Sequence, residues 1–216
     1  MFDPQDPHAG LPALTDGPAP KDAAGAIVLV HGRGASPEDI YTVFEALEVP
    51  SLAVVAPRAA DDTWYPYSFL SPMARNEPKL GSALRALERV VEHLEAQGVP
   101  AARIALLGFS QGACLSLEFA ARHARRYGAV IALSGGLIGP PGTPRDYQGS
   151  LAGTPLFLGC SDVDSHIPVD RVRESAEVMA RLGAAVDARI YPGMGHTVNA
   201  DELKAARGLV LGLAAP

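Results

Sequence analysis

Cysteine is scarce in this sequence, as are basic residues and long apolar runs, and each shortage excludes a class of protein. Only Cys114 and Cys160 occur, and the start Met1–Pro7 has neither a basic region nor an apolar core, so we expect free thiols in a cytoplasmic protein. No apolar run approaches the roughly 18–20 residues that span a bilayer, which predicts no stable membrane insertion. Eighteen basic against 24 acidic side chains leave a net charge of −6, which excludes nucleic acid as a partner.

Composition divides the chain into two regions. Residues 1–25 are dense in Pro, Gly, Asp and Ala without periodicity, which predicts an irregular, surface-hugging or partly disordered lead-in. In residues 26–216, short apolar runs alternate with helical stripes; strands are expected at 26–30, 52–56, 103–107, 129–133, 155–158 and 188–191. Helices are expected to begin at Pro37, Leu80, Pro168 and Asn199. This alternation predicts one α/β domain with a mostly parallel, doubly wound sheet.

A Gly-x-Ser-x-Gly motif stands where one of these strands meets a helix. The strand 103–107 runs into Gly108-Phe109-Ser110-Gln111-Gly112, and a helical pattern follows at once. This context is that of a nucleophile elbow, in which a strained turn lifts the serine clear of the sheet at a helix N-terminus. The glycines are expected because side chains at either flank would clash with so tight a turn. The motif predicts a serine nucleophile, Ser110.

A serine hydroxyl needs a base, and His196 is the best placed of the six histidines. In α/β hydrolases the chain order is serine, acid, histidine, and His196 follows the last expected strand in a glycine-bracketed loop. The acid should then follow the strand 155–158, where Asp162 and Asp164 are both candidates. The same side chains with His166 could be proposed to hold zinc, but they lack a short repeated ligand spacing, and we expect no metal.

An oxyanion formed at Ser110 requires backbone N–H donors. One is expected from Gln111, directly after the nucleophile, and the other from the glycine-containing loop 31–34 after the first buried strand. His31 in this loop is interpreted as a brace for the loop and not as a catalytic group.

Several motifs together resemble those of the phospholipase/carboxylesterase family, the acyl-protein-thioesterase-like branch of the α/β hydrolases. They are Leu29-Val30-His31-Gly32-Arg33-Gly34, Pro57-Arg58, Trp64-Tyr65, the Ser110 elbow, Asp164-Ser165-His166-Ile167-Pro168 and Gly193-Met194-Gly195-His196. The resemblance runs from Ile27 to the C-terminus. It implies an α/β-hydrolase fold with a minimal lid or none, no cofactor, and hydrolysis of carboxylic esters or thioesters.

The resemblance also implies roles for single residues. It places the backbone donors at Arg33 and Gln111 and favours Asp164 as the acid, because the family's spacing to the following proline is kept there, whereas counting from the strand-end glycine gives Asp162. It places Trp64 and Tyr65 at an aromatic position that lines the acyl pocket. The Arg33 side chain departs from the family's eukaryotic thioesterases, which have leucine there, and its guanidinium is expected at the rim, where it would attract a carboxylate or phosphate of the substrate.

These observations predict a serine hydrolase that cleaves small to medium acyl esters or thioesters through an acyl-enzyme. With no length left for a large lid, the site should be an open groove, with Met194 near the base and Trp64 and Tyr65 on one wall. A dienelactone-hydrolase-like ring opener is the enzymatic alternative, but such enzymes usually carry cysteine where this chain has Ser110. A catalytically dead binding module is the third reading. A homodimer is compatible with the sequence.

Overall fold

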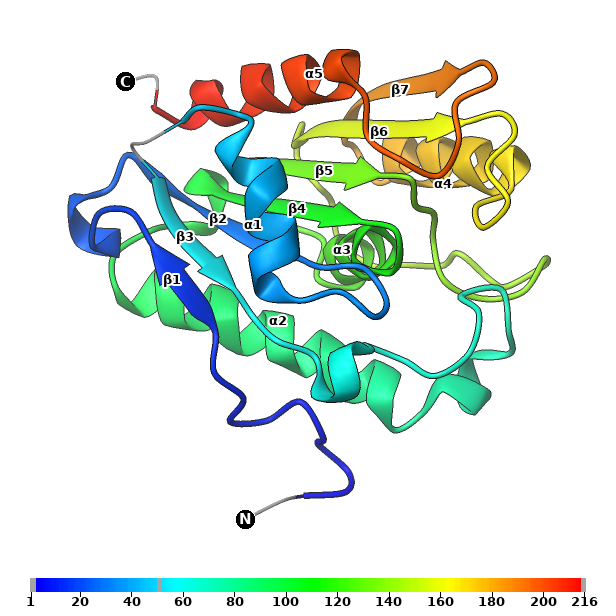
Figure 1. The fold of residues 1–216 in the computed structure, drawn as a ribbon, viewed down its shortest axis with the longest axis horizontal. Coiled ribbons are helices and arrows are strands. Elements are labelled where there is room, and N and C mark those ends of the chain that lie inside the picture. The colour runs from blue at the N-terminus through cyan, green and yellow to red at the C-terminus, as the bar shows by residue number, and fades with distance from the viewer. Residues whose placement is uncertain (1–2, 50–51, 215–216) are drawn as a thin grey trace.

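The computed structural model describes residues 3–49 and 52–214, and Figure 1 shows a single sheet flanked by helices. Residues 1–2 of the predicted lead-in, and residues 50–51 and 215–216 of the predicted domain, lie outside the described residues. The seven strands are β1 (Leu14–Asp16), β2 (Gly25–Val30), β3 (Leu52–Ala56), β4 (Ile104–Phe109), β5 (Ala129–Leu133), β6 (Pro155–Ser161) and β7 (Ala185–Tyr191). Their order is β1-β3-β2-β4-β5-β6-β7, and only β1 runs antiparallel to its neighbour. The mostly parallel sheet is confirmed.

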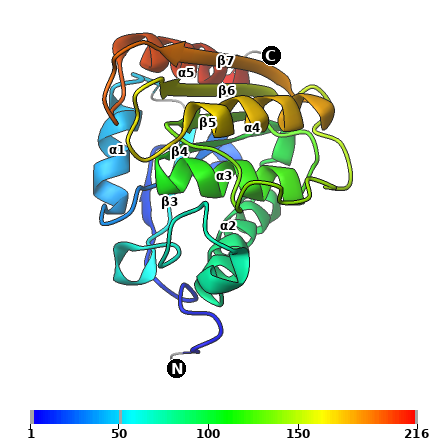
Figure 2. The same cartoon turned by 90° about the vertical axis from the view of Figure 1, so that its right-hand side faces the viewer.

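Helices cover both faces of the sheet, as Figures 1 and 2 show. They are α1 (Pro37–Glu45), α2 (Lys79–Ala96), α3 (Gln111–Arg122), α4 (Val169–Arg181) and α5 (Ala200–Leu211). One hydrophobic cluster packs α1 and α5 on the sheet, and a larger one packs α2, α3 and α4 on the opposite face. The central strands β2, β4 and β5 are buried along almost their whole length, because both faces are covered. The doubly wound arrangement is confirmed.

Local sequence signals explain where two of these helices begin. Ser36 caps α1: its hydroxyl accepts the Asp39 N–H, and the Asp39 carboxylate accepts the Ser36 N–H. Asn199 and Glu202 form the same reciprocal capping box at α5. The residues predicted as stops, Gly98 and Gly183, have φ values of +91° and +86°, which glycine adopts without steric cost.

The first 25 residues are more ordered than predicted. Residues 14–16 form β1, which pairs with β3 at the edge of the sheet, and His8 is buried with 3% of its surface exposed. The prediction of an irregular lead-in is therefore wrong for this part. A three-residue edge strand takes its hydrogen bonds from a neighbour that is distant in sequence, so it leaves no periodicity to read.

The candidate functional site lies at the end of the sheet where its parallel strands terminate. The carboxyl ends of β2, β4, β6 and β7 meet there, together with the connection between β3 and α2, which contains only short 3₁₀ turns. Ligands of such sheets bind beyond the carboxyl ends of the strands. No helix in the described ranges combines the length and the apolar character needed to cross a membrane.

Candidate active site

Ser110 occupies a strained turn between β4 and α3. Its φ and ψ are 54° and −117°, a conformation that L-residues rarely adopt. The flanking glycines have no room for a side chain: a Cβ on Gly108 would lie 2.3 Å from the Gly112 carbonyl oxygen, and one on Gly112 would lie 2.0 Å from the Val30 carbonyl oxygen. The turn has the geometry predicted for an elbow.

His196 connects this serine to a carboxylate. The Ser110 hydroxyl lies 2.8 Å from His196 Nε2, and His196 Nδ1 lies 2.7 Å from Asp164 Oδ2. Ser110 comes from the elbow, His196 from the β7–α5 loop and Asp164 from the β6–α4 loop. The fold thus brings His196 into contact with a serine 86 positions away and an aspartate 32 positions away in the sequence. The rings of Phe109 and His166 lie against the His196 imidazole, with centroids 4.9 and 4.7 Å away.

The two aspartates that the sequence offered occupy different environments. Burial raises the pKa of Asp164, but hydrogen bonds from His196 and from the His166 and Ile167 N–H groups outweigh it, so this pKa lies below its ordinary value. The carboxylate is therefore held ionised beside the imidazole. Asp162 is exposed and accepts the Gly193 N–H at 2.8 Å, which braces the loop that carries His196. The structure brings Asp164, not Asp162, to His196.

Two backbone N–H groups of residues that line the cavity beside Ser110 have no hydrogen-bond acceptor among the described residues. Among the described residues, neither the Arg33 nor the Gln111 N–H donates an intramolecular hydrogen bond. The loop that carries Arg33 is braced by His31, whose Nδ1–H donates to the Gly32 carbonyl and whose Nε2 accepts the Ala59 N–H. Both backbone donors are therefore free to bind an oxygen of a substrate.

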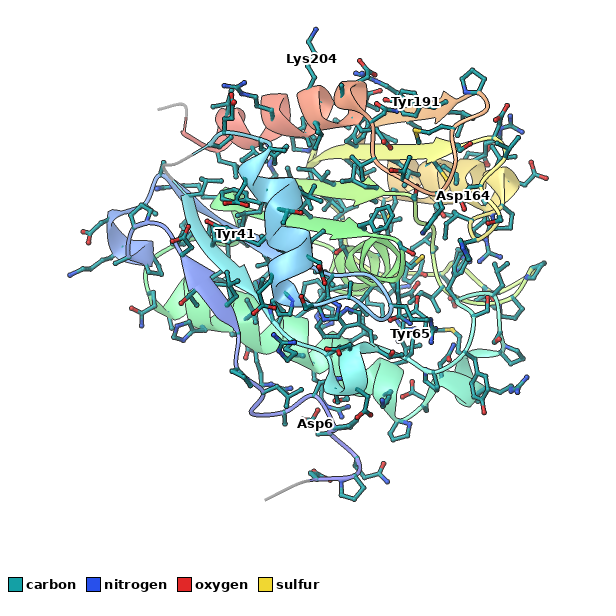
Figure 3. The ribbon with its side chains drawn as sticks, viewed as in Figure 1. Asp6, Tyr41, Tyr65, Asp164, Tyr191 and Lys204 are labelled. Carbon is teal, nitrogen blue, oxygen red and sulfur yellow. The ribbon has the colours of Figure 1, made fainter. Side chains whose placement is uncertain are left out.

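A cavity of about 420 Å³ opens beside Ser110. The rings of Phe109, His166 and His196 line one part of it, and the segment 65–69 lines another. The lining also includes Arg33, Gln111, Cys114 and Ile167. Figure 3 shows that Tyr65 and Asp164 both lie at the end of the sheet toward which the β4–β7 arrowheads point.

Two of the predicted pocket residues lie elsewhere. Trp64 has no exposed surface, and its indole N–H donates to the His31 carbonyl at 2.9 Å, so it belongs to the core. Met194 does not line the cavity, and its sulfur accepts from the Asn199 side chain. Only Tyr65 of the three predicted residues lines the cavity. Within the described part of the chain, no group of three or more His, Cys, Asp or Glu side chains is arranged to hold a metal ion.

Comparison with known proteins adds to this geometry. A model of the phospholipase/carboxylesterase family matches residues 18–210. The chain belongs to this family. It is 28% identical over 225 residues to acyl-protein thioesterase 1 of Debaryomyces hansenii, covering 93% of this chain and 96% of that protein. It is 26% identical over 220 residues to a probable carboxylesterase of Oryza sativa, covering 91% and 82%.

A solved structure of another family member has the same fold. The phospholipase/carboxylesterase of Dyadobacter fermentans is 42% identical, with a TM-score of 0.90 over 94% of this chain and 97% of that one. The resemblance inferred from the sequence is thus confirmed, and so is the α/β-hydrolase fold. As a member of the phospholipase/carboxylesterase family, this chain is a hydrolase.

Several residues around the cavity of the present chain were not predicted from its sequence. Tyr67 and Phe69 follow the predicted Trp64-Tyr65 position and line the cavity, but a segment without periodicity does not reveal which rings face inward. His166 and Ile167 belong to the motif that contains Asp164 and could have been suggested by that proximity. Asn76, which is fully buried and holds the backbone of Tyr67 and Ser68, gave no signal at all.

Proposed function

We propose that this protein is a serine esterase that cleaves carboxylic ester or thioester bonds through Ser110, His196 and Asp164. The observation that carries the proposal is the continuous pair of hydrogen bonds, 2.8 Å and 2.7 Å, from the elbow serine through the imidazole to a buried carboxylate. A catalytically dead module would have no need to keep this geometry beside an open cavity. The elbow serine likewise argues against the dienelactone-hydrolase-like alternative.

Each group has a defined task in the reaction. The Ser110 oxygen attacks the acyl carbon while its proton passes to His196 Nε2, and the carbonyl oxygen becomes an oxyanion that accepts the Arg33 and Gln111 N–H groups. Collapse of this intermediate breaks the bond to the leaving alcohol or thiol, which takes the proton from His196. Water then attacks the acyl-enzyme by the same route and releases the carboxylic acid and free Ser110. Asp164 stabilises the imidazolium in both halves.

The cavity supports a small or medium acyl group. Its volume of about 420 Å³ lies toward the lower end of the range for small-molecule pockets, and its lining includes the rings of Tyr65, Tyr67, Phe69 and Phe109. The relatives named as thioesterase and carboxylesterase support both leaving-group classes. Since both cysteines are unpaired and buried, we place the protein in a reducing compartment such as the cytoplasm.

The test combines covalent labelling with turnover. Wild-type protein is expected to react with a fluorophosphonate probe and to hydrolyse p-nitrophenyl acetate and butyrate, with thioester analogues run in parallel. Ser110→Ala should lose the label and lower kcat by about 10⁴-fold or more, with an unchanged circular dichroism spectrum. A folded Ser110→Ala protein that retained more than a few per cent of the activity would disprove the assignment.

A further inference from the structure

The segment 64–68, here called the aromatic wall, contributes residues 65–68 to the cavity lining and has no regular secondary structure. Its backbone polar groups are instead satisfied by side chains from other parts of the chain. Gln111 accepts the Trp64 N–H and donates to the Tyr65 carbonyl, at 2.9 and 2.8 Å. Asn76 accepts the Tyr67 N–H and donates to the Ser68 carbonyl, at 2.9 and 3.1 Å. Side chains therefore decide where the aromatic wall stands.

Arg33 supplies two further contacts to this backbone. Its Nη1 and Nη2 donate to the carbonyls of Pro66 and Tyr67 at 2.8 and 2.7 Å, and its guanidinium lies 5.9 Å from the Tyr65 ring centroid. No ion pair joins Arg33 to a carboxylate among the described residues. Its planar fork thus bridges two successive carbonyls, which a lysine ammonium could not match in geometry.

The position of Arg33 connects two parts of the site. The backbone N–H groups of Arg33 and Gln111 are the proposed oxyanion donors, while the side chains of the same two residues hold the aromatic wall. The wall is thereby fixed relative to the reacting carbonyl carbon. Of the residues that hold it, Gln111 and Asn76 are buried, whereas Arg33 is exposed and can be exchanged without opening a core cavity.

We propose that Arg33 is a positioning residue that sets acyl-chain selectivity by holding the aromatic wall against the oxyanion site. This inference rests on the proposed function. It differs from the expectation that Arg33 attracts an anionic group of the substrate, because it assigns the guanidinium to the two protein carbonyls to which its terminal nitrogens donate. A fixed wall can distinguish acyl chains by up to about fourfold per buried methylene, and a wall that moves loses this discrimination.

The experiment compares Arg33→Met and Arg33→Lys with Arg75→Met. Arg75 is a matched control, since its guanidinium also lies over a ring of the wall, 4.4 Å from the Tyr67 centroid, without bonding the wall's carbonyls among the described contacts. For each variant, kcat and KM are measured on p-nitrophenyl acetate, butyrate and hexanoate. An ester whose acyl chain ends in a carboxylate is included. Thermal unfolding and fluorophosphonate labelling establish that each variant is folded and carries an active serine.

Arg33→Met is expected to reduce the butyrate-to-acetate ratio of kcat/KM at least threefold. Arg33→Lys should restore part of this ratio, and Arg75→Met should leave it unchanged. The proposal is overturned if Arg33→Met lowers activity on the anionic ester alone, which would make Arg33 a reader of substrate charge. An equal loss on all esters, or the same change of ratio in Arg75→Met, would overturn it too. If wild-type protein fails to label or turn over any ester, the proposed function fails instead.

Discussion

At the scale of single residues, Asp164 is held by opposing influences. Its side chain has no exposed surface, and burial alone would favour the neutral acid. Hydrogen bonds from an imidazole and two backbone N–H groups reverse this preference and lower its pKa. The carboxylate is thus both ionised and fixed in direction, which is what stabilisation of an imidazolium requires. Cys160 lies directly behind it, with its sulfur 3.7 Å from Asp164 Oδ2.

The effects on kcat of replacing Asp164 or Asp162 by asparagine show which of the two is the acid. Asp164→Asn keeps the shape but removes the charge that stabilises protonated His196, and the equivalent change in a serine protease lowers kcat about 10⁴-fold. Asp162→Asn retains an oxygen that can accept the Gly193 N–H, so we expect less than a tenfold effect. Steady-state kcat on p-nitrophenyl acetate measures both. The opposite ranking would move the acid to Asp162.

The two thiols should be inert in the folded protein. Burial raises the pKa of both Cys114 and Cys160 to about 12, so the reactive thiolate is rare at neutral pH. We expect no modification by iodoacetamide at pH 7.5 within an hour, and two modifications after denaturation in guanidinium chloride. Intact-mass spectrometry distinguishes these states. Labelling of native Cys114, which lines the cavity, would show that the cavity admits reagent as far as this thiol, and labelling of native Cys160 would contradict the prediction for that thiol.

At the scale of elements, the elbow depends on close approach between backbones. Gly112 is a helical residue of α3, where alanine would ordinarily be preferred, but the Val30 carbonyl of the neighbouring strand leaves no space for a Cβ. Gly208 lies in α5 with nothing within 4 Å of its Cβ position. The two glycines therefore share helical backbone and differ in their surroundings.

This pair provides a direct test of the packing around the elbow. Gly112→Ala should destabilise the protein by about 3 kcal/mol or more, because strand β2 or the start of α3 must move. Gly208→Ala should stabilise it by about 0.5–1 kcal/mol through helix propensity. Urea unfolding measures both free energies. A neutral Gly112→Ala variant would show that the elbow can relax around a methyl group.

Much of this architecture could be predicted, since its signals are local. The strands at 52–56 and 129–133 have the predicted bounds, because continuous apolar runs between turn residues mark strands that are buried on both faces. Ser110 and His196 could be found because a motif and a chain order specify them. β7 begins three residues before its predicted start, since this edge strand consists of exposed and half-buried residues and lacks a continuous apolar run.

What could not be predicted depends on contacts between distant segments. Trp64 and Tyr65 were predicted as pocket residues, but the backbone that carries them and Tyr67 is held by the side chains of Gln111, Arg33 and Asn76. Trp64 was expected in the pocket and lies in the core, because its indole N–H finds an acceptor at His31. Because the residues that form these contacts are far apart in the sequence, no local sequence pattern predicts them.

At the scale of the whole molecule, the N-terminal segment helps to hold the active site. His8 Nε2–H donates to the Trp64 carbonyl, and its Nδ1 accepts the Ala60 N–H. His31 on the other side accepts the Ala59 N–H, and the two imidazoles flank the Trp64 ring with centroids 5.4 and 4.9 Å away. Both histidines must be neutral to accept these N–H groups, and burial lowers the pKa of each.

This arrangement predicts that stability declines in mild acid. An imidazole in the unfolded chain has a pKa of about 6.5, so as the pH falls through that value the unfolded state takes up protons before the folded state does. The stability contributed by neutral His8 and His31 is therefore complete above about pH 6.5. Below it, stability is lost by up to about 1.4 kcal/mol per pH unit for each histidine, until the pH falls below their folded-state pKa values.

Urea unfolding between pH 7.5 and 5.5 measures this loss, and single substitutions assign it. His8→Gln keeps a donor near the Trp64 carbonyl but cannot titrate, so its free energy of unfolding should be lower at pH 7.5 and should fall less steeply toward pH 5.5 than that of the wild type. His93→Gln is the matched control, because it exchanges a histidine that is exposed on α2 and makes none of these hydrogen bonds. If His8→Gln and the wild type declined in parallel, the acid sensitivity would come from other groups, and the N-terminal segment would not hold the site through a neutral histidine.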